Sequence, residues 1–416
     1  MINTEAATEA TVTVSPYAVL RNGDVLLYLI GRFVASLGQQ MVTLAVGWEL
    51  YQRTHSTLAL AMVGLTQMLP MVLFTLPAGH VADNYSRKSI IVLMNLLMAM
   101  ASLGLTLISA LEAPVFWIYF CLFAAGTART FLWPASSAFL PQLVSRREFS
   151  RVVAWSSGSF QLSSVAGPAL GGALIALTHH AAPVYAINAA AALTCLALIS
   201  FVRRTHTVTA REKMTMESLS VGFRFVFASP IILGVITLDL FAVLLGGATA
   251  LLPVYAQDIL RVGPTGLGFL QAALPMGSLL CALVLAHRPP MRKAGRAMLS
   301  AVAAFGVATI IFGFSRWFWL SFLMLFACGA VDNISVVVRH TLVQLLTPDE
   351  KRGRVSAVNS LFIGTSNELG GFESGIVAYW LGPVFSVVAG GVGTILVVLA
   401  VALIWPSIRT YGRLDA

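Results

Sequence analysis

Six ionisable side chains lie inside long apolar segments of this chain, where a charge is costly. They are Arg32, Arg129, Asp239, Asp332, Glu368 and Glu373. An ionisable residue in such a segment usually binds a ligand, pairs with an opposite charge or moves an ion. Both bases fall in the first half of the chain and all four acids in the second. We therefore expect ion pairs between the halves.

Sequence position suggests which residues pair. Asp332 lies 203 residues after Arg129, at the equivalent place in the second half. Arg32 and Asp239 lie at a similar depth in their segments. We predict that these two pairs form and break as the halves move, with fixed structural ion pairs as the alternative.

The acids are also candidate proton carriers. A carboxylate in a low-dielectric site can hold a proton near neutral pH, and Asp239, Glu368 and Asp332 are the leading candidates. Glu373 follows Glu368 by five residues, which places it about 140° away around a helix. We expect one of these two glutamates to face a cavity and the other to face a neighbouring helix.

Polar residues recur at helical spacing near the buried charges. Arg32, Ser36, Gln39 and Thr43 follow one another at steps of four, three and four, so they share one helix face. A second shared face carries Asn359, Ser366, Gly370 and Glu373. The two faces predict a polar lining, to which we assign Ser36, Gln39, Thr43, Asn359 and Ser366.

The composition indicates what must position these residues. Of 416 residues, 58% are hydrophobic and 10% charged, whereas soluble domains carry about 25% charged residues. The surrounding solvent must therefore be lipid. Twelve apolar stretches are long enough to cross a bilayer: 24–50, 57–78, 89–109, 115–138, 152–177, 183–202, 231–256, 266–286, 296–314, 317–337, 356–378 and 381–405.

The basic residues predict the orientation. With the N-terminus inside, 21 of the 26 Lys and Arg residues fall in cytoplasmic segments and three outside, as the positive-inside rule requires. We expect an N-terminal tail (1–22), a six-helix bundle (23–202), a central cytoplasmic loop (203–229), a second six-helix bundle (230–405) and a C-terminal tail (406–416). Both termini would be cytoplasmic. Within the central loop, Met214–Ser229 is suited to an amphipathic surface helix.

A ten-residue stretch between the second and third apolar segments combines a glycine, an acid and two bases as Gly79-x-x-x-Asp83-x-x-x-Arg87-Lys88. Gly79 would let two helices approach closely. Asp83 would pair with a base and hold the cytoplasmic side closed. The alternative is a solvated loop that only sets topology.

A second motif lies in the fifth apolar segment. Gly167 and Gly171 are four residues apart, so they share a face that permits close packing. Pro168 removes a backbone donor and bends the helix. Ordinary helix packing is one interpretation of this motif.

The Gly79–Lys88 stretch, the twelve segments and the two similar halves resemble the major facilitator superfamily. The chain is similar in particular to the enterobactin-exporter-like branch, through Leu238–Phe241, Leu251–Ala256, Gly353–Asn359 and Ser366–Gly370. The Gly167–Pro168 pair resembles the fifth-helix signature of family antiporters. The resemblance implies an all-α fold of two pseudo-symmetric six-helix bundles. It also implies proton-driven efflux from a bacterial cytoplasmic membrane, with monomers as the family default.

We therefore expect a proton-coupled antiporter that exports a small amphipathic organic solute, such as a siderophore or a drug, by alternating access. An importer or facilitator of a small organic anion, with Arg32 and Arg129 as ligands, and a lysophospholipid flippase are the alternatives. The chain has no nucleotide loop, metal-ligand cluster or nucleophile motif, so we expect neither an enzyme nor a cofactor. The net charge of +9 follows membrane topology, so no nucleic-acid partner is expected.

Overall fold

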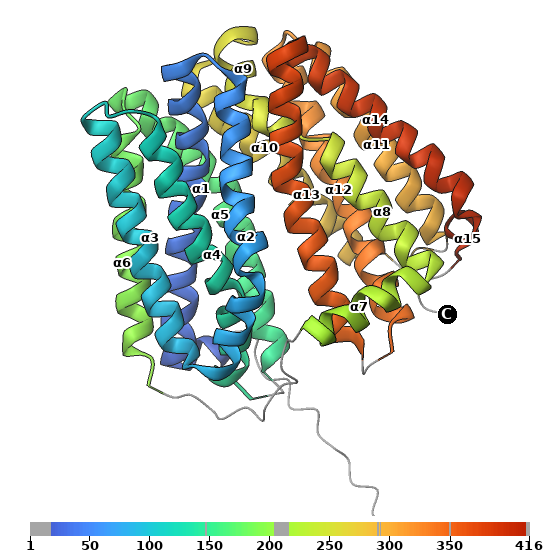
Figure 1. Cartoon of the computed structure of the whole chain (residues 1–416), viewed down its shortest axis with the longest axis horizontal. Helices are drawn as coiled ribbons and strands as arrows, with labels where there is room; N and C mark the ends of the chain where they lie inside the picture. The colour runs from blue at the N-terminus through green and yellow to red at the C-terminus, as the bar shows by residue number, and fades with distance from the viewer. Residues whose placement is uncertain are drawn as a thin grey trace, which may run out of the picture.

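A computed structural model describes residues 18–145, 148–203, 216–288, 291, 293–348 and 351–412. Residues 1–17 of the predicted N-terminal tail and 204–215 of the predicted central loop lie outside the described residues, as do Arg146, Arg147 and the last four residues. The described chain folds into helices that form two bundles side by side (Figure 1). The structure confirms the predicted all-α membrane fold.

The first bundle follows a short 3-10 turn, η1 (Ala18–Arg21). Its helices are α1 (Gly23–Thr54), α2 (Thr57–Asn84), α3 (Arg87–Ala110), α4 (Phe116–Leu143), α5 (Phe149–Thr178) and α6 (Ala182–Phe201). The Asn22 side chain caps α1 by accepting a hydrogen bond from the Asp24 amide at 3.1 Å. At the other end of α1, His55 adopts a left-handed conformation (φ 47°) and turns the chain into α2.

The second bundle begins with α7 (Met216–Ala228), which lies within the predicted amphipathic stretch. The seventh span is α8 (Pro230–Leu245), η2 (Ala248–Leu251), α9 (Leu252–Val254) and the π-helical turn η3 (Tyr255–Ile259). The remaining helices are α10 (Gly263–Ala286), α11 (Ala294–Phe314), α12 (Phe318–Leu346), α13 (Arg352–Leu381), α14 (Pro383–Ile404) and α15 (Pro406–Thr410).

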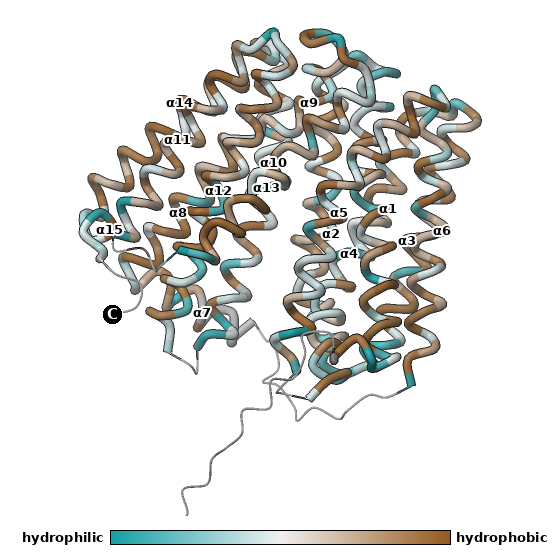
Figure 2. The backbone as a smooth tube through the Cα atoms, turned by 180° about the vertical axis from the view of Figure 1, so that it is seen from behind, coloured by the Kyte–Doolittle hydropathy of each residue, from teal (hydrophilic) through white to brown (hydrophobic). Residues whose placement is uncertain are grey.

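Eleven helical segments in the described ranges are long and apolar enough to cross a membrane. α13 has 30 residues, but its polar and charged side chains lower its hydropathy. Apolar residues cover long stretches of the helices, and hydrophilic residues gather near their ends (Figure 2). The count of twelve spans and the cytoplasmic location of the termini stay predictions.

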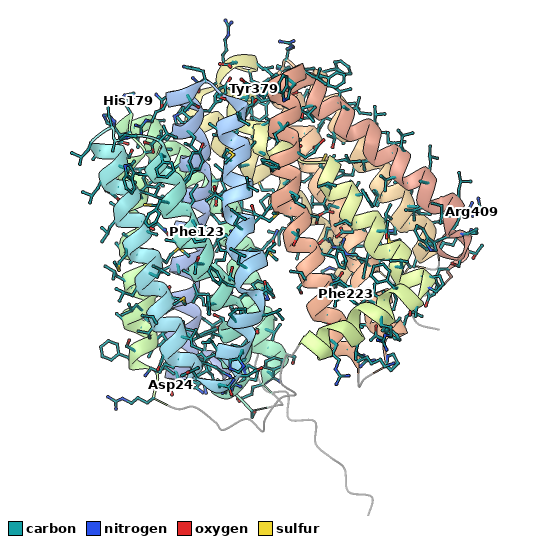
Figure 3. All side chains as sticks on the ribbon, viewed as in Figure 1. Asp24, Phe123, His179, Phe223, Tyr379 and Arg409 are labelled. Atoms are coloured by element: carbon teal, nitrogen blue, oxygen red, sulfur yellow. The ribbon has the colours of Figure 1, made fainter. Side chains whose placement is uncertain are left out.

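The two ends of the molecule are distinguished by their loops. Asp24 lies at one end of the first bundle, and His179 and Tyr379 lie at the opposite end (Figure 3). We call the end with Asp24 the inner end, because residues 79–88 lie there and the bases Arg87 and Lys88 are predicted to be cytoplasmic. The opposite end is the outer end.

At the outer end the two bundles share one apolar core. It includes Leu50 and Tyr51 of α1 together with Leu252, Tyr255 and Leu270 of the second bundle. The bundles approach each other at this end and diverge toward the end that carries α7 (Figure 1).

Toward the inner end the buried residues of each apolar cluster come from a single bundle, and Leu76 of α2 packs against one cluster of the second bundle. Tyr28 and Phe139 belong to a cluster built from the first bundle, and Val235 and Met298 belong to one built from the second. Buried apolar area therefore holds the bundles together mainly at the outer end. The bundles are closed at the outer end and diverge toward the inner end, which is an inward-facing conformation.

Candidate functional site

One ion pair joins the two bundles near the middle of the helices. The Arg129 guanidinium on α4 lies 2.9 Å from a carboxylate oxygen of Glu368 on α13, and the side chains are 46% and 22% exposed. α2 positions both partners. A Cβ on Gly64 of α2 would lie 2.5 Å from the Glu368 carbonyl oxygen, and one on Gly126 of α4 would lie 3.2 Å from Pro70. The absence of two side chains therefore lets α4 and α13 pack closely on α2.

In this conformation Arg129 pairs with Glu368 and not with the predicted partner Asp332. Asp332 lies on α12, and among the described residues it forms no ion pair. The offset of 203 residues identifies equivalent positions in the two halves of the chain. Two positions related by a rotation axis contact each other only when they lie close to that axis. The sequence located the charges but not the contact.

The predicted pair of Arg32 and Asp239 is also replaced. Asp239 on α8 forms an ion pair with Arg339 on α12, inside the second bundle, and both side chains are nearly buried. Arg32 instead donates a hydrogen bond to the Tyr28 hydroxyl at 3.3 Å, one turn away on α1. The predicted span 317–337 leaves Arg339 in the cytoplasmic segment that follows it. α12 continues to Leu346, which puts Arg339 within the helix.

The polar face of α1 points toward the second bundle. Continued outward at steps of four, the series from Arg32 to Thr43 reaches Gly47 and Tyr51. A Cβ on Gly47 would lie 3.1 Å from Pro253, and the Tyr51 hydroxyl donates a hydrogen bond to Asp258. The polar face of α1 therefore lies on the same side of the helix as residues that contact the second bundle. Thr43 is exposed, and the buried Gln39 Oε1 has no hydrogen-bond partner in the described part of the chain.

The inner part of this face meets α5. Arg32 and Ser36 line a small pocket between the two helices with Ser156, Ser159 and Phe160. Polar groups therefore extend from the middle of α1 toward its inner end.

The polar face predicted on α13 is mostly packed. Asn359 and Ser366 are buried, and the Ser366 hydroxyl donates a hydrogen bond to Ile363 at 3.0 Å. In this arrangement neither residue lines an open space. Glu373 is half-buried and accepts a hydrogen bond from Ser374 at 3.3 Å. Of the two glutamates, Glu368 is the one that contacts the first bundle, through Arg129.

The motif from Gly79 to Lys88 is mostly helical rather than a loop. Gly79 and Asp83 lie in the last turns of α2, and α3 begins at Arg87. The Lys88 ammonium donates to the carbonyl oxygens of Ser200 and Val202, each at 2.8 Å. It thus caps the end of α6 within the first bundle. The gating role assigned to Asp83 stays a prediction.

The glycines of α5 pack on α1, as their spacing suggested. A Cβ on Gly167 would lie 2.5 Å from that of Gln40, and one on Gly171 would lie 3.2 Å from the Met41 backbone. The neighbouring face of α5 meets the second bundle, because the Pro168 carbonyl oxygen would lie 2.5 Å from a Cβ on Gly268 of α10. α5 is therefore packed between α1 and α10.

Comparison with known proteins gives the family. Residues 14–410 match the family model described as transmembrane secretion effector. The chain belongs to this family of the major facilitator superfamily. It is 27% identical over 393 residues to the enterobactin exporter of Shigella boydii serotype 4, covering 92% of each chain. It is 28% identical over 396 residues to that of Escherichia coli O1:K1, again covering 92% of each.

Solved structures agree on the fold. The nucleoside transporter NupG superposes with a TM-score of 0.73 at 13% identity, covering 92% of this chain and 99% of that one. A bacterial homolog of the human lysosomal transporter Spinster, in an inward-facing and occupied conformation, gives 0.72 at 15% identity, covering 95% and 99%. The protein is thus a multi-pass transporter of a bacterial membrane and not an enzyme.

Proposed function

We propose that this transporter exports a small amphipathic organic molecule by proton-coupled antiport and alternating access. The direction is supported by the relatives named as enterobactin exporters, and alternating access by two bundles that share an apolar core at the outer end and diverge toward the inner end. The observation that carries the coupling is the ion pair of Arg129 and Glu368. It is the point where a proton can change how the two bundles interact.

The coupling follows from the charge on one carboxylate. Ionised Glu368 attracts Arg129 across the two bundles, whereas protonated Glu368 carries no charge and retains at most a hydrogen bond from the guanidinium, without the attraction between opposite charges. Proton uptake therefore weakens one link between α4 and α13, and proton release restores it. A group that changes charge at the interface of two rocking bundles can tie proton movement to their motion.

The same place suits amphipathic cargo. Trp133 follows Arg129 by one turn on the same face of α4 and is 70% exposed. An apolar ring surface and a cation therefore lie on one face of α4. Cargo with apolar and polar parts would find partners for both.

Arg129 also supports the alternative function, an importer or facilitator of a small organic anion. Its guanidinium is 46% exposed and can bind a carboxylate. In that case Glu368 would compete with the cargo for Arg129. Transport would then proceed without opposite proton movement.

The test is transport by purified protein in liposomes with an imposed pH gradient and an internal pH indicator. The panel contains siderophores, lipophilic cations and lysophospholipids. Proton movement opposite to one compound class supports antiport and identifies the cargo. Movement of an organic anion without opposite proton flux favours the importer or facilitator, and lysophospholipid flipping favours the flippase.

A further inference from the structure

Arg32 lies within a span and has no carboxylate beside it. Arg129 and Arg339 each form an ion pair, whereas Arg32 forms none with any described residue. Its guanidinium instead donates a hydrogen bond at 3.3 Å to the Tyr28 hydroxyl, which carries no charge. Arginines at membrane depth are normally paired with a counter-charge or a backbone carbonyl. The positive charge of Arg32 is therefore available to an anion that comes from outside the chain.

Serine hydroxyls line a recess beside this guanidinium, between α1 and α5. Ser36 of α1 and Ser156 and Ser159 of α5 border the recess together with Arg32. Within the described part of the chain, none of these three hydroxyls takes part in a hydrogen bond. Serines in a helix often donate to the carbonyl of the preceding turn. Three hydroxyls that remain available beside one cation therefore form a set of donors for a ligand.

The next serines along α5 are engaged in packing. The Ser163 hydroxyl lies within donating distance of two carbonyl oxygens, that of Ser159 at 3.0 Å and that of Phe33 on α1 at 3.3 Å. Ser164 accepts a hydrogen bond from Gln40 of α1 at 2.8 Å. These bonds hold α1 against α5. The recess begins one turn nearer the inner end, where the serines have no such partners.

The recess lies at about the same depth on both helices. Arg32 is nine residues from the start of α1 and Ser159 is ten from the start of α5, which is about 14 Å and about 15 Å at 1.5 Å per residue. Both side chains are half-buried. The bundles diverge toward the inner end (Figure 1). A solute that enters between them from that end therefore meets the polar face of α1.

The donors of the recess suit an oxyanion. A guanidinium can bind a carboxylate through two parallel hydrogen bonds, and hydroxyls can donate to its remaining lone pairs. The recess encloses about 200 Å³, its open mouth included, whereas sites for whole ligands have about 300–1,000 Å³. It therefore has room for one polar group of a larger solute. Phe160, which also borders the recess and is 51% exposed, offers a ring to the apolar part.

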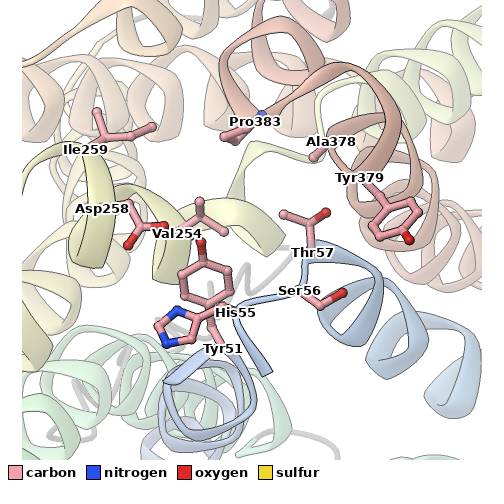
Figure 4. Close-up of a pocket in the computed structure, with 10 residues that line it drawn as sticks. All are labelled: Tyr51, His55, Ser56, Thr57, Val254, Asp258, Ile259, Ala378, Tyr379 and Pro383. Carbon is pink, nitrogen blue, oxygen red and sulfur yellow. Dashed lines mark hydrogen bonds between the residues drawn. The ribbon is translucent and has the colours of Figure 1, made fainter. Parts of the chain in front are cut away.

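A larger cavity at the outer end has the opposite character. It has a volume of about 410 Å³, and its lining includes Tyr51, His55 and Asp258 (Figure 4). The Asp258 carboxylate accepts a hydrogen bond from the Tyr51 hydroxyl, and neither a lysine nor an arginine lines this cavity. A negative charge there disfavours an anion. The recess beside Arg32 is the better place for one.

We propose that the recess formed by Arg32, Ser36, Ser156 and Ser159 is the subsite that binds an oxyanion of the cargo. The proposal rests on the proposed export of an amphipathic organic molecule, and it names the class of that molecule. The cargo is an organic anion whose charged oxygens enter the recess while its apolar part stays between the bundles. Arg32 then binds substrate, and it neither moves a proton nor pairs with the second bundle.

The test measures equilibrium binding to the purified protein in detergent at neutral pH, by saturation-transfer NMR. The probe is naphthoate, and naphthamide is its uncharged counterpart with the same rings. Naphthoate should bind at least about tenfold more tightly, because a hydrogen bond to a charged group contributes more than a neutral one. Equal binding of the two compounds, or no saturable binding of naphthoate, would overturn the proposal.

Substitution of Arg32 tests the charge. Arg32→Gln should weaken naphthoate binding about tenfold and leave naphthamide binding unchanged. Arg32→Lys keeps the charge but loses the planar pair of donors, so its affinity should fall between those of the other two proteins. Because Arg32 leaves no carboxylate unpaired, neither substitution should lower the melting temperature.

Substitution of the serines tests the recess with Arg32 intact. The double variant Ser156→Ala/Ser159→Ala should weaken naphthoate binding. Ser157→Ala is the matched control, because Ser157 is exposed on the same helix and does not border the recess. An equal loss in the control would contradict the recess. Lost binding in Arg129→Gln with full binding in Arg32→Gln would place the anion at Arg129 and also overturn the proposal.

Binding in detergent needs no proton gradient, so the result is independent of antiport. Arg32-dependent naphthoate binding by a protein that shows no proton-coupled transport would retain the subsite and refute antiport. Proton-coupled transport of a solute without anionic oxygens, at an unchanged rate in Arg32→Gln, would retain antiport and refute the subsite.

Discussion

The guanidinium of Arg129 lies 2.9 Å from the carboxylate of Glu368, and this ion pair joins α4 of the first bundle to α13 of the second. Both side chains are partly exposed. Such pairs contribute about 0–1 kcal/mol to stability, far less than the shared apolar core at the outer end. The pair is therefore too weak to hold the bundles together alone, and weak enough to break in each transport cycle.

Replacing Glu368 with glutamine should uncouple transport without unfolding the protein. Glutamine has nearly the same shape but neither binds nor releases a proton, so pH-gradient-driven transport should fall to the rate measured without a gradient. Transport by the purified variant in liposomes with an imposed pH gradient measures this loss. Glu373→Gln, on the same helix, is the matched control and should change flux less. Normal coupled flux in Glu368→Gln would remove this residue from the mechanism.

Exchanging the two charges should restore part of the function. Arg129→Glu alone places two carboxylates face to face, and Glu368→Arg alone places two guanidiniums together, so each should fail. The double exchange recreates the attraction and should transport better than either single variant. The comparison is exchange of Arg129 with Asp332, which do not pair and should give no rescue. Equal activity of the single and double variants would argue against the contact.

Hydropathy was enough to find the buried charges but not their partners. Arg129 and Glu368 stood out because both interrupt long apolar stretches. Their pairing depends on how α4 and α13 pack on α2, through the close approach at Gly64, and no periodicity encodes that. Arg339 was missed because a helix continues beyond the point where its residues cease to be apolar.

The outer contact was hidden for a different reason. Tyr51 lies near the end of an apolar stretch, where tyrosines commonly anchor a span at the membrane surface. Asp258 lies two residues beyond the seventh apolar stretch (231–256), and nothing in the sequence pattern points to a partner for it. Only the irregular turns after Gly247 bring its carboxylate to the Tyr51 hydroxyl.

Asp239→Asn should destabilise the second bundle rather than only uncouple transport. Arg339 is 4% exposed in its side chain, and removing its partner leaves a buried charge uncompensated, at a cost of about 3–5 kcal/mol. Thermal unfolding in detergent measures the loss. The double variant Asp239→Leu/Arg339→Met removes both charges and should recover most of the stability. A stable single variant with lost coupling would instead return Asp239 to the proton pathway.

Gly172→Ala should weaken the junction of the bundles at the outer end. The added methyl group would lie 2.3 Å from the Pro264 carbonyl oxygen of α10, so the α5 and α10 backbones must separate. Overpacking of this kind costs about 1–3 kcal/mol. Gly158→Ala is the matched control on α5, because nothing lies within 4 Å of its Cβ position. We expect a lower melting temperature for Gly172→Ala and not for Gly158→Ala. In a Cys281→Ala background, a cysteine introduced as Thr43→Cys should also react faster in Gly172→Ala, and no faster in Gly158→Ala, with a membrane-impermeant maleimide added outside right-side-out vesicles. If both alanine variants behave alike, the close approach of α5 to α10 does not determine how firmly the outer end is closed.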